Sequence, residues 1–413
     1  MMCNSVRRWI PLWVLVGMVL LGLALVGRIS ADGVTPRSID RNLEPVVLTG
    51  GNLPLLQGTP VDFLFAYALR DGIYQQIPFQ VDHVTSVGVY TTRLGGSLGP
   101  TDEIVFMASD LGDLSYPVQI TESLPISSTW YQIEVTDSLS PTLKGWAYIV
   151  RSSSLTKTFT QTYASFDAAT NQITASRYVL GFASSHPGLG YLALNGSGVD
   201  ILDRTKIRLE TYLGTFTEDF LGPQPIDLIK DGPVRVIARG GTIIGYSSMF
   251  HSAISTTLPA GVTGVRLSTD FNVNAAPSTF YNANTPAGVT VDGSPDTIAP
   301  SPLSPWWEVA GGTGTLVQVG DFSLAGGTQT NYYKDDDMID PTDTGDQKSY
   351  GDTGLRVDVP NPTVVYQMTY FVLPADQPNV GARYGAYVAQ PLQVTTTAQG
   401  RLHHTYLPIV IRN

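Results

Sequence analysis

The chain is poor in cysteine and histidine, and this scarcity excludes several kinds of catalytic and metal site. Its 413 residues include one cysteine, Cys3, and five histidines. Beyond residue 3 the chain can therefore form no disulfide, thiol nucleophile or thiolate metal site. The glycine-rich dinucleotide and phosphate motifs are also missing, as are the H-E-x-x-H and G-x-S-x-G motifs. No motif in the sequence identifies a reaction.

Charged residues are sparse as well, at 14% of the chain, and the acids outnumber the bases by 35 to 24. The net charge of −11 argues against nucleic acid and against anionic membranes as partners. An acidic surface suits solubility outside the cell and the binding of cations. The partners that we expect are a cell-surface glycan or further copies of the same chain.

The first 31 residues have the pattern of a secretory signal peptide. Arg7 and Arg8 precede an apolar run at residues 9–27, and Ala31 is a small residue before a polar stretch. We therefore expect a secreted or cell-surface protein that has no membrane attachment after cleavage. The alternative is an uncleaved membrane anchor, because the apolar run is long enough to span a bilayer.

The remaining composition is typical of an all-β protein. The chain has 41 glycines and 28 prolines, and few segments show a helical period. Short runs rich in Val, Thr and Tyr lie between turn residues, which predicts antiparallel β-sandwich units. We expect an N-terminal sandwich at residues 32–157 and a larger sandwich or supersandwich at residues 158–394. Residues 395–413 are predicted to be a linker followed by a terminal apolar strand.

Individual strands can be predicted from the alternation of side chains. Residues 363–373 give the strongest strand prediction, with a central position in a sheet. Residues 87–92 are predicted to be a strand of the N-terminal sandwich. The final strand, at residues 406–411, is either a sorting signal or added strand, or a plain edge strand.

The densest group of charges lies at residues 332–357, which we predict to be an acidic loop between two strands. Seven aspartates fall in this stretch, and they repel one another unless water or a cation separates them. Calcium, a hard cation that prefers oxygen ligands, fits this composition. The alternative is a solvated acidic loop. The predicted calcium ligands are Asp335, Asp337, Asp340, Asp343 and Asp346.

The acidic stretch departs from two known motifs. It is not an EF-hand, because Gly351 stands where that loop needs its final Glu. Asp-Thr-Gly at residues 343–345 and 352–354 resembles the signature of aspartic proteases. Those enzymes need one such turn on each of two lobes, whereas both copies here lie in one polar stretch. We interpret them as a consequence of composition.

Trp306 and Trp307 are candidate ligand-binding residues. Adjacent residues of a strand point to opposite faces, so we expect one indole in the core. The other could be exposed, where its face can stack on a sugar ring. The alternative is that the second indole is shielded under a loop.

Several segments resemble known groups of proteins. Residues 76–83 together with 99–112 resemble uncharacterised exported β-rich proteins of bacteria, and the Tyr-Leu-Pro-apolar-Arg ending resembles the tails of many exported proteins. A polar cluster of this region is either a metal site or a set of side chains that pair across a strand end. Its members are Gln80, Asp82, Asp102, Glu103 and Asp110.

The motif Asp-Gly-Pro-Val-Arg at residues 231–235, with the large-sandwich layout, resembles the β-supersandwich of sugar mutarotases and some carbohydrate-active enzymes. The catalytic His and Glu motifs of those families have no match here. Two hypotheses follow. The first is an exported, calcium-stabilised protein with a structural, adhesive or binding role. The second is a carbohydrate-active enzyme or glycan-binding protein, and a Trp beside paired acids in a cleft would favour it.

Overall fold

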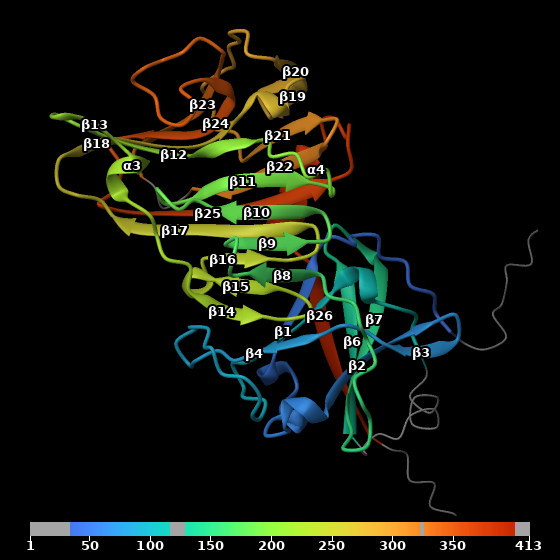
Figure 1. Cartoon of the computed structure of the whole chain (residues 1–413). Coiled ribbons are helices and arrows are strands. Elements are labelled where there is room, and N and C mark those ends of the chain that lie inside the picture. The colour runs from blue at the N-terminus through green and yellow to red at the C-terminus, as the bar shows by residue number, and fades with distance from the viewer. Residues whose placement is uncertain (1–33, 116–128, 323–325, 401–413) are drawn as a thin grey trace, which may run out of the picture.

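The computed structural model describes residues 34–115, 129–322 and 326–400, and their fold is all-β (Figure 1). Every strand pair between the named strands is antiparallel, and the sheets pack as sandwich units, so the predicted fold class is confirmed. The expected signal peptide at residues 1–31 and the expected terminal strand at residues 406–411 lie outside the described residues. No helix among the described residues is long and apolar enough to cross a membrane.

The N-terminal sandwich consists of two sheets around one apolar core. Its three-stranded sheet has the order β1-β5-β4, with β1 (Pro45–Thr49), β4 (Gln80–Asp82) and β5 (Glu103–Met107). Its five-stranded sheet has the order β26-β6-β7-β2-β3, with β2 (Leu64–Arg70), β3 (Ile73–Gln76), β6 (Thr129–Asp137), β7 (Ser140–Arg151) and β26 (Gln393–Gly400). Phe106 and Ile149 are fully buried between the sheets.

Strand β26 belongs to this N-terminal sheet although it comes from the far end of the chain. It pairs with β6 along its whole length, from Gln393 opposite Thr136 to Gly400 opposite Thr129. The expected linker is therefore wrong for residues 395–400. The threonines that suggested a linker are β-branched residues that also suit an edge strand, and Val394 packs against the N-terminal core.

The larger sandwich contains three sheets. The first has the order β11-β10-β9-β8, with β8 (Ala164–Asp167), β9 (Gln172–Ala175), β10 (Tyr178–Phe182) and β11 (Leu189–Leu194). The second has the order β13-β12-β18-β24-β23, with β12 (Leu202–Thr211), β13 (Gly214–Thr217), β18 (Val262–Phe271), β23 (Thr328–Asp336) and β24 (Ser349–Asp358).

The third sheet has nine strands in the order β14-β15-β16-β17-β25-β22-β21-β19-β20. Their bounds are β14 (Leu228–Asp231), β15 (Val236–Ala238), β16 (Ile243–Gly245), β17 (Met249–Thr257), β19 (Ser278–Asn282), β20 (Thr285–Val291), β21 (Trp306–Gly311), β22 (Gly314–Asp321) and β25 (Thr363–Leu373). Among the described residues, two α-helices accompany the sheets, α3 (Glu218–Leu221) and α4 (Gly381–Ala389). Short 3₁₀ turns lie at Gly50–Asn52, Pro54–Leu56, Val61–Phe63, Ala108–Asp110, Arg239–Gly241 and Val273–Ala275.

Strand β25 confirms the strongest strand prediction, including its bounds and its central place between β17 and β22. The acidic stretch is shorter as a loop than predicted, because β23 and β24 extend into it and leave only residues 337–348 between them. The strand predicted at residues 87–92 is wrong. That segment is a loop with one isolated bridge, and Val87 in it is 82% exposed.

A buried arginine joins the N-terminal sandwich to the larger one. Arg235, at the end of the Asp-Gly-Pro-Val-Arg motif, donates from Nε to Asp82 at 2.8 Å and from Nη2 to Glu103 at 2.5 Å. Gln80 accepts the backbone N–H groups of Val234 and Arg235. Two of the sequence motifs therefore meet in one interface, and the polar cluster around Gln80 pairs with protein groups here.

Candidate functional site

A cavity of about 680 Å³ lies between the five-stranded sheet that contains β12 and the nine-stranded sheet. Ligand sites of small molecules commonly have volumes of roughly 300–1,000 Å³ and mostly apolar walls. Exposed residues form part of its rim, including Leu221, Gln224 and Pro259. The apolar part of its wall includes Ile207, Leu209, Leu267, Phe280, Val364 and Met368.

Strand β12 shows an unusual distribution of burial around this cavity. Ile207 and Leu209 face the cavity and remain only half-buried, whereas Lys206 and Arg208 on the opposite face are buried. Charged side chains are rarely buried unless they are paired. A sandwich strand usually buries its apolar face and exposes its charged face. On β12 the charged face is buried, and the apolar face is only partly covered.

One row of side chains crosses the cavity wall on four neighbouring strands. Asn282 lies opposite Trp307, Trp307 opposite Gln318, and Gln318 opposite Tyr370. All four residues line the cavity. The Nε1 of Trp307 is buried and has no hydrogen-bond partner, and the same is true of the hydroxyl of Tyr366 in the wall. Most of the cavity wall is therefore apolar, and this row of side chains on the nine-stranded sheet is its more polar part.

The two tryptophans do point to opposite faces of β21, but neither is exposed. Trp307 packs edge-to-face on Phe271 and Tyr370 inside the sandwich, and it is 6% exposed. Trp306 is 7% exposed and lies under α4, where a Cβ on Gly381 would come within 2.1 Å of its ring. Of the two alternatives for the second indole, the exposed one is wrong and the shielded one fits, with helix α4 in place of a loop as the cover, because the glycines of α4 let its backbone approach the ring.

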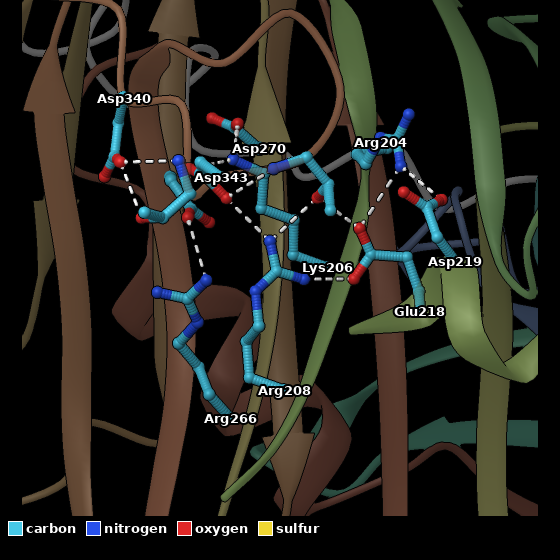
Figure 2. A network of polar contacts seen from close by, with 12 residues as sticks. Arg204, Lys206, Arg208, Glu218, Asp219, Arg266, Asp270, Asp340 and Asp343 are labelled. Carbon is cyan, nitrogen blue, oxygen red and sulfur yellow. Dashed lines mark hydrogen bonds and ion pairs between the residues drawn. The ribbon is translucent and has the colours of Figure 1, made fainter. Parts of the chain in front are cut away.

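The outer face of β12 carries a network of buried charges, shown in Figure 2. The Nζ of Lys206 lies 2.5 Å from Asp270 Oδ2 and 2.7 Å from Asp343 Oδ2. Arg208 donates to Asp343 at 2.6 Å and also pairs with Glu218 of α3. The 337–348 loop and α3 therefore cover the charges of the strand and supply their counter-ions.

Burial and the neighbouring cations affect the pKa of the Asp343 carboxyl group in opposite directions. Burial raises the pKa of its carboxyl group, but the hydrogen bonds and charge of Lys206, with the bond from Arg208, outweigh burial and lower the pKa to about 2. For Asp203, burial and the nearby Asp346 outweigh the charges of Arg204 and Lys206 and raise the pKa of its carboxyl group to about 6.

The five predicted calcium ligands have separate environments. Asp335 accepts the backbone N–H groups of residues 292, 293 and 351, and Asp340 pairs with Thr342 and Lys334. Asp343 pairs with two buried cations, and Asp337 and Asp346 are exposed. Within the ranges that the structure describes, no three of these five converge on one point that could hold a metal.

A different group of three carboxylates does converge. Asp203, Asp270 and Asp346 each place an oxygen within 4.8 Å of the others. Only Asp346 belongs to the predicted set. Asp203 and Asp270 were missed because they come from strands far away in the sequence. The available signal was an aspartate within an apolar strand segment, at Leu202-Asp203 and at Asp270-Phe271.

Comparison with known proteins adds little to this picture. No family model matches the chain, and no curated protein matches it. Among solved structures, an alpha-mannosidase from Enterococcus faecalis V583 is similar over 89% of this chain, with 12% identity and a TM-score of 0.44. A protein in the glycosyl hydrolase family 38 from Enterococcus faecalis is similar over 89%, with 11% identity and a TM-score of 0.45. The chain spans 46% and 48% of those chains. Similarities at this level of identity and TM-score carry no information on the function of this chain.

Proposed function

We propose that this protein binds a small, largely apolar molecule with a polar end, in the cavity between the sheet that contains β12 and the nine-stranded sheet of its larger sandwich. The observation that carries this proposal is the reversed burial on β12, where Ile207 and Leu209 stay half-buried while Lys206 and Arg208, which alternate with them, are buried. Apolar burial is the main driving force of folding, so an unfilled apolar wall needs an explanation. A ligand that covers it gains free energy roughly in proportion to the apolar area removed from water.

The chemistry of the cavity wall favours binding over catalysis. Asp227 and Arg239 are the only charged side chains among the described wall residues. A glycoside hydrolase of the usual type needs two carboxyl groups roughly 5–10 Å apart across the bound sugar. The wall offers one carboxyl group, which lies with Arg239 on the same side as the rim residue Gln224. The apolar body and the row at Trp307 are suited to holding a ligand.

A glycan in the same cavity is the second candidate, and the row on the nine-stranded sheet favours it. An indole flanked by amide side chains, as Trp307 is by Asn282 and Gln318, combines a stacking face with hydrogen-bonding groups. A sugar would occupy this row and leave the apolar wall of β12 unfilled. The two candidates therefore differ in which wall the ligand covers.

We also propose that binding takes place outside the cell, in secreted form or at the cell surface. The support is the signal-peptide pattern of residues 1–31. The lack of cysteine beyond Cys3 is compatible with export, because a chain of this length can bury a large core without disulfides. The N-terminus of secreted protein is expected at or near Asp32, as measured by N-terminal sequencing. A mature chain that retains residues 9–27 in a membrane fraction would contradict cleavage.

The binding proposal is tested with N-phenyl-1-naphthylamine, an apolar dye whose fluorescence rises in an apolar site. Wild-type protein should bind one dye per chain, and a medium-chain alcohol such as dodecanol should displace it. Ile207→Trp should weaken dye binding by about tenfold or more, because the indole occupies the volume that the dye needs.

The matched control is Leu213→Trp, which adds the same side chain at a position that is 74% exposed in the β12–β13 turn. It should bind the dye as the wild type does. Equal dye binding by Ile207→Trp and the control would contradict the proposed site. Displacement of the dye by soluble oligosaccharides but not by dodecanol would favour the glycan candidate instead.

A further inference from the structure

The loop at residues 337–348 brings an exposed carboxylate to two strand-borne carboxylates on the outer face of the sheet. Asp203 comes from β12, Asp270 from β18 and Asp346 from the loop, and one oxygen of each lies within 4.8 Å of the others. The backbone N–H of Asp346 donates to Asp203 at 3.2 Å. Gly345 makes this approach possible, because its φ is +77° and a Cβ there would lie 1.9 Å from Asp203 Oδ2.

A second observation is that individual oxygen atoms of Asp270 and Asp203 are buried without a hydrogen-bond donor. Asp270 is 0% exposed, the Nζ of Lys206 lies 2.5 Å from its Oδ2, and its Oδ1 is buried with no hydrogen-bond donor. The Oδ2 of Asp203 is also buried and has no hydrogen-bond donor, and the Nε of Arg204 lies 3.7 Å from it. An ionised carboxylate removed from water without a compensating partner is strongly unfavourable. A cation between Asp270, Asp203 and Asp346 would supply such a partner.

The balance of charge around the three carboxylates supports the same conclusion. Asp352, beside Asp270, is 0% exposed, and neither of its oxygens has a hydrogen-bond donor. The Nη2 of Arg266 lies 4.0 Å from its Oδ2. In the described network, seven carboxylates face four basic side chains. The carboxylates are Asp203, Glu218, Asp219, Asp270, Asp343, Asp346 and Asp352, and the bases are Arg204, Lys206, Arg208 and Arg266.

We propose that a divalent cation binds between Asp203, Asp270 and Asp346 and fastens the 337–348 loop to the outer face of the sheet. The donor set consists of oxygen atoms alone, which selects a hard cation. Calcium fits better than magnesium, because it accepts irregular sets of six to eight oxygens completed by backbone carbonyls and water, whereas magnesium demands near-ideal octahedral geometry. The cation site is separate from the cavity, so it neither requires nor excludes the proposed ligand.

The test is calcium titration of the chelator-treated full-length protein by isothermal calorimetry, together with melting in calcium and in EDTA. Wild-type protein should bind one calcium per chain, and calcium should raise the melting temperature by roughly 2–4 °C, because binding favours the folded state. Asp203→Asn with Asp346→Asn should weaken calcium binding at least tenfold and remove the calcium-dependent rise in melting temperature. In EDTA this double variant should melt no lower than the wild type, since it removes two repelling charges.

The matched control is Asp336→Asn with Asp337→Asn, which removes the same charge next to the same loop but outside the three carboxylates. It should keep the calcium response of the wild type. The proposal is overturned if wild-type protein shows no calcium response, or if the Asp203/Asp346 variant binds calcium as tightly as the wild type. Tighter binding of magnesium than of calcium would overturn the choice of calcium.

Discussion

The five-stranded sheet that contains β12 buries its charged outer face more completely than its apolar inner face, which is opposite to the usual pattern of a sandwich. The outer face carries Lys206, Arg208 and Asp270, and the 337–348 loop and α3 seal it. The inner face carries Ile207 and Leu209, and it borders a cavity of about 680 Å³. The difference teaches that ion pairs close the charged face of this sheet, whereas packing within the chain leaves its apolar face incompletely covered. The following predictions test each half of this comparison.

Lys206→Met should produce the largest loss of stability. The methionine keeps the apolar stem but leaves Asp270 and Asp343 without their ammonium partner. Removal of one member of a buried ion pair typically costs about 3–5 kcal/mol. Urea denaturation in EDTA measures this loss without a contribution from bound cations.

The control for this prediction is Lys334→Met, because Lys334 lies half-buried on the same sheet and pairs with Asp340 at 3.5 Å. A pair with this exposure is worth about 0–1 kcal/mol. If the two lysine variants lose similar amounts of stability, the sealed outer face does not determine the stability of the sheet.

The sealed face should also make the protein sensitive to acid through Asp343. Its pKa in the folded protein is about 2, below the value of 3.8 for an unperturbed aspartate. A lowered pKa contributes stability that is present above pH 3.8 and is lost as the pH falls through 2. The contribution is about 2 kcal/mol. Denaturation of wild type and Asp343→Asn between pH 5 and pH 2 should show a steeper fall for the wild type. Parallel curves would mean that Asp343 is not held as an ionised partner of Lys206.

On the inner face, a larger side chain should stabilise the protein without ligand. Ile207→Phe fills part of the cavity, and cavity-filling substitutions commonly add about 0.5–2 kcal/mol. The comparison is Ile149→Phe in the closed N-terminal core, where the residue is 0% exposed and overpacking costs about 1–3 kcal/mol. Chemical denaturation should therefore give opposite signs for the two variants. A loss of stability in both would mean that the larger sandwich is as tightly filled as the smaller one.

The sequence predicts local structure well wherever alternation alone decides it. Residues 363–373 alternate in a way that places Tyr366 and Tyr370 toward one face and Phe371 toward the other, and β25 follows this pattern. The opposite directions of Trp306 and Trp307 are predicted for the same reason. The exposure of Trp306 was not predictable, because it depends on α4, whose glycines lie more than 70 residues later.

Long-range partners account for the other differences between prediction and structure. The partner of β26 is β6, more than 250 residues earlier, so a threonine-rich segment near the chain end could not be distinguished from a linker. Asp343 pairs with Lys206 across 137 positions. A useful signal was present on β12, where Lys206 and Arg208 alternate with Ile207 and Leu209. It indicated a charged face, but not that this face is buried.

Amide hydrogen exchange with and without saturating N-phenyl-1-naphthylamine tests the central claim most directly, because it locates the bound molecule. The proposed cavity predicts slower exchange in β12 and β18 of the larger sandwich, with unchanged exchange in β2 and β7 of the N-terminal sandwich. Ile207→Trp should abolish this protection. Slower exchange in the N-terminal strands, or no change in β12 and β18 at saturation, would contradict binding between the sheets.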